Sequence, residues 1–126
     1  MKIRILDDSI RLRLDRDEVE RIGSGERVDC RTRFPNAASL AYGLEVSGER
    51  TSATFTGQGI VVNVPASAAR DWASNESDVS IRGEVLLDDG VLRILVEKDF
   101  ECLEPREGES QSNRFANPKS ADATIV

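Results

Sequence analysis

The chain has 126 residues, of which 39% are hydrophobic and 32% are charged, and its net charge is −6. This is enough apolar sequence for the core of one domain, so a wholly disordered chain is excluded. The acidic balance argues against a nucleic-acid or anionic-membrane binder. The absence of histidine excludes His-based catalytic triads and His-ligated zinc sites.

Alternation of apolar and polar residues dominates the first half of the chain and predicts four half-buried strands. Their inward-facing sets are Ile3 and Ile5; Ile10, Leu12 and Leu14; Val28, Cys30, Thr32 and Phe34; and Leu40, Tyr42, Leu44 and Val46. After the second strand, Asp15 followed by Glu18 has the pattern of a capping box. Val19 and Ile22 then form a short apolar stripe that ends at the glycines of 23–25, so a short helix is predicted here.

The second half repeats this order of elements. Its four strands are carried by Ala53 and Phe55; Ile60, Val62 and Val64; Val79, Ile81, Val85 and Leu87; and Leu92, Ile94 and Val96. Pro65, a favoured first helical residue, opens a second short helix that ends near Ser74. Turn-forming residues separate the strands: Asp7-Asp8, Pro35-Asn36, Ser47-Gly48, Gly57-Gln58-Gly59 and Asp88-Asp89-Gly90.

Matching elements of the two halves lie about 50 positions apart in the sequence. Pairs with this spacing are Ile5/Phe55, Ile10/Ile60, Leu12/Val62, Leu14/Val64, Val19/Ala69, Ile22/Trp72, Leu44/Ile94 and Val46/Val96, whereas Val28/Val79 and Phe34/Val85 need one residue more. The spacing favours a duplicated strand-strand-helix-strand-strand unit over two halves that are alike by coincidence. The predicted fold is mainly β (α+β), an eight-stranded antiparallel barrel with two short helices that forms a single domain over residues 1–103.

Residues 104–126 are rich in Ser, Asn, Pro and Ala and predict a partly mobile C-terminal tail. Phe100, Leu103 and Phe115 are the residues expected to hold its first part against the barrel. No stretch of the chain has the length and hydropathy of a signal peptide or a membrane span. A cytoplasmic protein without a membrane partner, either a monomer or a homodimer, is therefore expected.

The polar face of the strands is positively charged although the chain as a whole is acidic. Its cations are Lys2, Arg4, Arg11, Arg13, Arg31, Arg33, Arg82 and Arg93, and its anions are Asp29, Glu45, Glu84 and Glu97. Arginine suits bidentate contact with phosphate or carboxylate. A small phosphate-type anion is therefore the predicted ligand, with these contacts: Arg11, Arg13, Arg31, Arg33, Arg82 and Arg93.

The direction of the arginine side chains decides between this prediction and its alternative. If the arginines point inward, the barrel holds a channel of positive potential. If the apolar residues point inward, the arginines lie on a solvated outer face and their stems cover apolar neighbours.

The sequence indicates no catalytic residue and no metal site. Cys30 and Cys102 are the only thiols and do not form a CxxC pair, so no metal ligand is assigned. Paired carboxylates fall in turns and at helix starts, where backbone geometry accounts for them, so no catalytic residue is assigned. One Trp and one Tyr give no stacking platform for nucleic-acid bases, and no cofactor is indicated.

The order of elements resembles the CYTH-like barrels of the triphosphate tunnel enzymes over roughly residues 2–100. The strand 60–64 followed by Pro65 and a helix, and the late strand 92–100, carry this likeness. The resemblance implies a channel-forming barrel. The strand Ile10-Arg11-Leu12-Arg13-Leu14 stands where that family has metal-binding carboxylates, so no catalytic residue carries over.

Nearly the whole chain also resembles a group of short, uncharacterised bacterial proteins. They share an opening like Met1-Lys2-Ile3-Arg4-Ile5, then Ser9-Ile10-Arg11-Leu12-Arg13-Leu14, and later Lys98-Asp99-Phe100-Glu101-Cys102-Leu103 followed by Pro105-Arg106-Glu107-Gly108-Glu109. This resemblance implies a bacterial cytoplasmic protein and no activity. Three functions stay open: an anion-binding barrel, a non-catalytic protein-interaction or structural module, and a tunnel-type phosphohydrolase.

Overall fold

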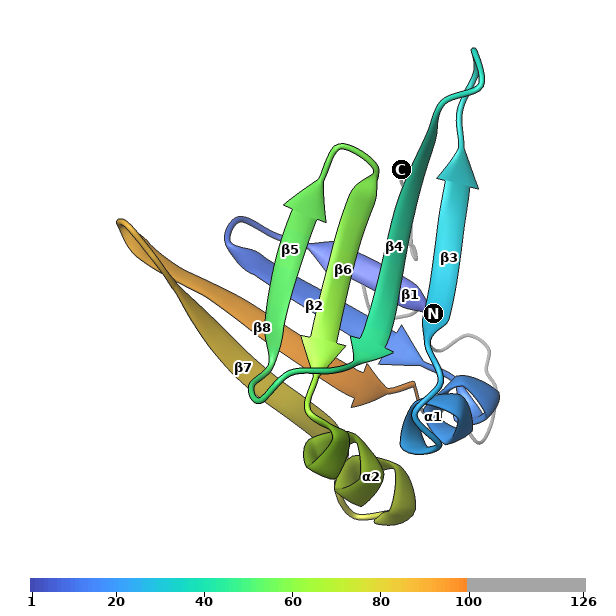
Figure 1. The fold of residues 1–126 in the computed structure, drawn as a ribbon, viewed down its shortest axis with the longest axis vertical. Helices are drawn as coiled ribbons and strands as arrows, with labels where there is room; N and C mark the ends of the chain where they lie inside the picture. Colours follow the sequence, from blue (N-terminus) through green and yellow to red (C-terminus); the bar gives the residue numbers. More distant parts are fainter. Residues whose placement is uncertain (100–126) are drawn as a thin grey trace, which may run out of the picture.

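The computed structural model describes residues 1–99, which form two four-stranded sheets and two helices. Sheet A contains, in spatial order, β1 (Lys2–Ile5), β2 (Ser9–Leu14), β8 (Gly90–Lys98) and β7 (Ser80–Leu87). Sheet B contains β3 (Val28–Arg33), β4 (Ser39–Val46), β6 (Gly59–Val64) and β5 (Ser52–Thr56). The helices α1 (Arg16–Gly23) and α2 (Ala66–Ser74) lie together at one end of the sheets, and the strand turns point away from them (Figure 1).

The predicted α+β class with two short helices is confirmed, but the prediction of a closed antiparallel barrel is wrong. The outer hairpins are antiparallel, whereas β2 pairs with β8 and β4 pairs with β6 in parallel. No ladder joins the two sheets within residues 1–99. Each helix carries the chain from one sheet to the other, so a hairpin from each half meets a hairpin of the other half side by side. Two mixed sheets result, and the channel implied by the likeness to tunnel enzymes is not formed.

Both halves follow the same order of elements, and each half contributes one hairpin to each sheet. The ladders correct part of the predicted correspondence. Leu12 lies opposite Val96 and Val62 lies opposite Leu44. With Leu12 and Val62 taken as equivalent, Leu44 therefore matches Val96 and not Ile94. The duplication itself stays a prediction.

The helix boundaries follow the local sequence. The Glu18 backbone N–H donates to Asp15 Oδ1 at 2.9 Å, and the Asp15 N–H donates to Glu18 Oε1 at 3.0 Å, which is the predicted capping box. The second helix begins at Ala66, so Pro65 is its N-cap and not its first helical residue. Its fixed φ of −65° still prepares the helical turn that follows.

The core lies between the sheets at the helix end. Its fully buried side chains include Leu12, Leu14, Ile22, Leu44 and Trp72. The Trp72 indole N–H donates to the Val79 carbonyl oxygen at 3.0 Å, so the largest core side chain is also satisfied as a donor. The strand alternation is thus confirmed, and the apolar set points inward.

The two helices touch at matching positions of the two halves. A Cβ built on Gly23 would lie 2.5 Å from the Cβ of Ala73, which is closer than two non-bonded carbon atoms approach. The absence of a side chain at Gly23 therefore lets α1 and α2 pack directly against each other and close this end of the molecule.

Residues 100–126 lie outside the described part of the chain, and the predictions that fall on them are not tested. These are the end of the predicted domain at residue 103, the tail 104–126, and the tail contacts of Phe100, Leu103 and Phe115. Cys102 and most of the C-terminal motif 98–109, which is shared with the bacterial proteins, lie there too.

Candidate functional site

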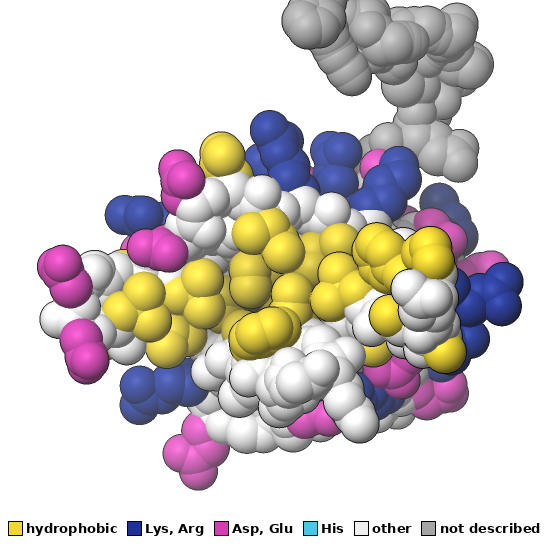
Figure 2. Space-filling model, turned by 90° about the horizontal axis from the view of Figure 1, so that it is seen from above, with side chains coloured by type: hydrophobic (Ala, Val, Ile, Leu, Met, Phe, Trp, Pro, Cys, Tyr) yellow, Lys and Arg dark blue, Asp and Glu magenta, His cyan; other side chains and the backbone are white. Residues whose placement is uncertain are grey.

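The strands leave an apolar opening between the sheets at the end opposite the helices. All four hairpins turn at this end (Figure 1), and inward-facing residues next to the turns stay exposed. We define the apolar mouth as these residues, with their exposed fractions: Ile5 (55%), Phe34 (53%), Leu40 (38%), Phe55 (77%) and Leu87 (43%). Figure 2 looks into this end and shows hydrophobic side chains running across it as a band.

The apolar mouth is large for an exposed surface. Because an aromatic side chain offers about 150–250 Å², Phe34 and Phe55 alone expose on the order of 250 Å². Ile5, Leu40 and Leu87 enlarge this area. Below them, Ile3, Tyr42, Val85 and Leu92 are partly buried against the core and form an apolar floor. The largest exposed apolar patch of a soluble protein is often functional.

Charges are unequally distributed around the mouth. The turns of sheet A carry four aspartates: Asp7 and Asp8 between β1 and β2, and Asp88 and Asp89 between β7 and β8. The two turns of sheet B at the mouth carry no acidic residue, but Arg31 and Arg33 lead into the β3–β4 turn. None of these six residues has an ion-pair partner within residues 1–99.

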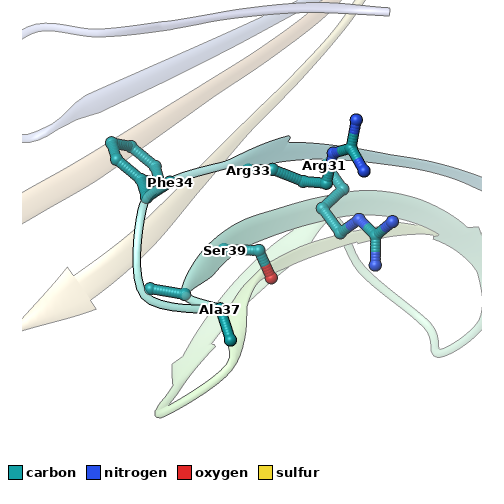
Figure 3. Close-up of a pocket in the computed structure, with 6 residues that line it drawn as sticks. Arg31, Arg33, Phe34, Ala37 and Ser39 are labelled. Carbon is teal, nitrogen blue, oxygen red and sulfur yellow. The ribbon is translucent and has the colours of Figure 1, made fainter.

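A hollow of about 460 Å³ lies at the β3–β4 turn, at the edge of the mouth. Its lining residues are Arg31, Arg33, Phe34, Ala37, Ala38 and Ser39. Figure 3 shows both guanidinium groups on one side of this hairpin and the Phe34 ring pointing away from them. Asn36 and Ala37 have φ values of 67° and 63°, and alanine rarely adopts this left-handed conformation. The turn thus holds a strained backbone beside an open, positively charged hollow.

The six predicted anion contacts lie on the outer faces of both sheets and do not converge on an enclosed space. Arg31 and Arg33 belong to sheet B, and the other four belong to sheet A. Arg11, Arg82 and Arg93 line one shallow hollow of about 340 Å³ together with Glu84 and Leu95. Arg93 lies 4.0 Å from the Glu84 carboxylate.

Arg13 and Arg11 are engaged by the same carboxylate. The Nε atoms of Arg13 and Arg11 lie 3.1 Å and 3.5 Å from Glu97 Oε1. Cross-strand ion pairs of this kind are typical of a solvated outer sheet face. The structure therefore divides the six arginines into a group of four on sheet A and the pair Arg31 and Arg33 on sheet B.

The N-terminus is tied to the first helix and to sheet B. The Met1 ammonium donates to Glu18 Oε2 at 2.6 Å, and the Tyr42 hydroxyl donates to the Met1 carbonyl oxygen at 3.0 Å. Burial opposes the charged ammonium, but the Glu18 contact outweighs it and raises the pKa of this group above 8.0. Burial also raises the pKa of Tyr42. The half-buried Cys30 thiol lies 3.8 Å from the same carbonyl oxygen. These contacts fix the chain end and form no reactive centre.

Within residues 1–99, no group of three or more Cys, Asp or Glu side chains is arranged to hold a metal ion. No helix in this region is long and apolar enough to cross a membrane.

Sequence reasoning missed the apolar mouth because it counted the residues of the mouth as ordinary core. A signal was present, since the apolar residues Ile5, Phe34, Phe55 and Leu87 each stand at or within two residues of a turn. They stay exposed because a gap separates the sheets at this end. The alternation of apolar and polar residues along a strand gives no information about that gap.

Residues 1–119 match a protein family described as "Family of unknown function (DUF7009)". The chain belongs to this family. The match covers most of the chain and agrees with the expected uncharacterised protein, although it tests neither the shared motifs nor the bacterial origin. Comparison with curated proteins and with solved structures found no match. The apolar mouth and the charged outer faces are therefore the features that indicate a function.

Proposed function

We propose that this protein is a non-catalytic interaction module that binds a partner protein through the apolar mouth. The observation that carries this proposal is the exposure of Phe34, Phe55 and Leu87 at inward-facing positions, whereas Val28 of β3 and Ile81 of β7 are buried nearer the helices. Exposing these side chains to water costs roughly 25 cal/mol per Å², and a bound partner removes that cost.

The polar edges of the mouth support the same function. Protein interfaces commonly combine an apolar, aromatic centre with a polar rim. Phe34 and Phe55 supply the aromatic centre here, and the aspartates and arginines of the turns supply the rim. An apolar cavity for a small molecule would instead be enclosed on most sides.

The experiment is selection from a random peptide library displayed on phage, with the purified chain immobilised. The expected result is enrichment of peptides with apolar anchors, which bind the wild type and lose at least about tenfold in affinity to Phe34→Ser with Phe55→Ser. The matched control is Val79→Ser, which removes an apolar side chain that is 41% exposed but lies between α2 and β7, at the helix end of the molecule. Peptides that bind the double variant equally well would refute the proposal.

A second function is supported by the outer face of sheet A, where anion binding remains a proposal. This face carries Lys2, Arg4, Arg11, Arg13, Arg82 and Arg93 against Glu84 and Glu97. Arg4 lies directly opposite Arg11, and Leu95 separates Arg11 from Arg82 in the next positions of the ladders. Like charges placed opposite each other destabilise a sheet unless an anion lies between them.

Thermal-shift measurements with phosphate, pyrophosphate, triphosphate and citrate test this second function. An anion held by Arg11, Arg82 and Arg93 raises the melting temperature of the wild type but not of Arg11→Ala with Arg82→Ala. The control pair is Arg31→Ala with Arg33→Ala, which removes two arginines from sheet B and keeps the shift. A shift of the same size in both double variants would mean that the sheet A hollow is not the site.

A further inference from the structure

The β7–β8 turn projects from one end of the mouth as an apolar and acidic knob. Leu86 is 82% exposed, and Asp88 and Asp89 follow within three residues. This hairpin, with strands of 8 and 9 residues, is the longest within residues 1–99, and its turn reaches beyond the other elements on that side (Figure 1). We define the acidic knob as residues Leu86, Leu87, Asp88 and Asp89.

The hollow at the β3–β4 turn has the complementary chemistry. Arg31 and Arg33 lack ion-pair partners within residues 1–99, and Phe34, Ala37 and Ala38 give the hollow an apolar wall. We define these five residues as the basic hollow. Two aspartates and two leucines of the acidic knob thus match two arginines and an apolar wall.

The β7–β8 turn, which carries the acidic knob, and the β3–β4 turn, which forms the basic hollow, lie on opposite sides of the molecule at the mouth end (Figure 1). A second copy that faces the mouth and is related by a two-fold axis across the apolar band has its ends reversed. Each acidic knob then meets the basic hollow of the other copy, and the two apolar mouths face each other. A surface that carries both halves of a contact is self-complementary under such an axis.

We infer that the partner of the apolar mouth is a second copy of this chain, and that the acidic knob of each copy enters the basic hollow of the other. This inference rests on the proposed function and names its partner. The charge match directs the two copies into one register, and burial of Phe34, Phe55 and Leu87 supplies most of the affinity.

Light scattering coupled to size-exclusion chromatography, over a range of protein concentrations, tests the inference on the full chain. The wild type is expected to have twice the mass of the chain and not to grow further. Asp88→Arg with Asp89→Arg places cations against Arg31 and Arg33 of the other copy. Arg31→Asp with Arg33→Asp places anions against its aspartates. Each pair of changes is expected to weaken the dimer at least about tenfold.

The decisive variant combines all four changes in one chain. It exchanges the charges of the acidic knob and the basic hollow, so the dimer is expected to return. The control is Arg16→Asp with Arg70→Asp, which makes the same charge change on exposed positions of α1 and α2 and leaves the dimer intact. If a reversal variant loses its circular-dichroism signature, Asp88→Asn with Asp89→Asn replaces it, with a smaller loss expected.

Any of the following results would overturn the inference: a wild type that stays monomeric, one that grows into open-ended polymers, a four-fold variant that fails to recover the dimer, or a dimer that persists in Phe34→Ser with Phe55→Ser. A monomeric wild type that still selects peptides through Phe34 and Phe55 leaves the proposed function standing and removes the second copy as the partner. A monomeric wild type that selects no peptide contradicts the proposed function as well.

Discussion

The helix end and the mouth end of this molecule are built from the same strands, but they treat apolar side chains in opposite ways. At the helix end, Leu14, Val64 and Trp72 are completely buried. At the mouth end, Phe34 and Phe55 are more than half exposed although they occupy inward-facing positions. The alternation of inward-facing and outward-facing side chains is therefore the same along each sheet. Only the packing of the gap between the sheets differs between the two ends.

The two helices account for the difference. Ile22 and Trp72 project from α1 and α2 into the gap between the sheets and fill it. Within residues 1–99 no element occupies the gap at the other end. Stability is thus concentrated at the helix end, and the apolar surface of the mouth remains available for binding. Substitutions at the two ends should separate these two roles.

The largest expected effect is the replacement of Trp72 by alanine. It removes the largest buried side chain, its hydrogen bond to the Val79 carbonyl and its contact with the Lys98 ammonium, 5.7 Å from the ring. Trp72→Ala should lower the free energy of unfolding by about 3–5 kcal/mol. Urea unfolding followed by circular dichroism measures the loss. The matched change Phe55→Ala should cost far less, and equal losses would contradict the proposed division between the two ends.

The next largest effect concerns the contact between the helices. Gly23→Ala places a Cβ 2.5 Å from that of Ala73 and forces α1 and α2 apart, at a cost of about 1–3 kcal/mol. The control is Gly57→Ala in the β5–β6 turn, where nothing lies within 4 Å of the added Cβ. Its unfolding midpoint in urea should stay close to the wild-type value. If both alanine variants behave alike, the close approach of the helices is not what stabilises this end.

A smaller, pH-dependent effect comes from the contact between the Met1 ammonium and Glu18. The folded state raises the pKa of the ammonium above 8.0, so the stabilisation is complete below pH 8.0 and is lost as the pH rises through the raised pKa. Glu18→Gln keeps the capping acceptor for Asp15 but removes the charge, and should cost about 1–2 kcal/mol at pH 7.

Unfolding of both proteins in urea across this pH range measures the effect on chains that begin at Met1. The difference in free energy between the wild type and Glu18→Gln should shrink above pH 8.0. A constant difference at every pH would show that the ammonium does not contribute. The same experiment on Asp15→Ala separates the loss of the helix cap, because this change removes the Oδ1 acceptor but leaves Glu18 and the ammonium in place.

The elements themselves were predictable from the sequence because burial follows local periodicity. Ile10, Leu12 and Val62 alternate with polar residues and are buried as expected. Asp15 and Glu18 form the predicted helix cap because the cap involves only neighbouring residues. The parallel pairing of β2 with β8 was not predictable in this way, because it joins Leu12 to Val96 across most of the chain.

The functional surface was harder to predict for the same reason. The apolar alternation showed which face of each strand is inward, and Arg11 and Arg13 accordingly lie outside. Whether Phe55 is covered depends on the distance between the sheets, which no local pattern sets. Positive charge on the polar face was visible in the sequence, but its division between sheet A and sheet B depended on the order of the strands.

The smallest expected effect on stability is the replacement of Phe55 by serine, and it sharpens the comparison most. Because Phe55 is 77% exposed, Phe55→Ser should change the free energy of unfolding by no more than about 0.5 kcal/mol, and it lowers the apolar area that contacts water. Binding at the mouth should nevertheless weaken clearly. Urea unfolding and peptide binding, measured on the same preparations, show whether Phe55 stabilises the fold or contributes to binding. A large loss of stability would mean that Phe55 belongs to the core, whereas unchanged stability with reduced binding assigns it to the interaction surface.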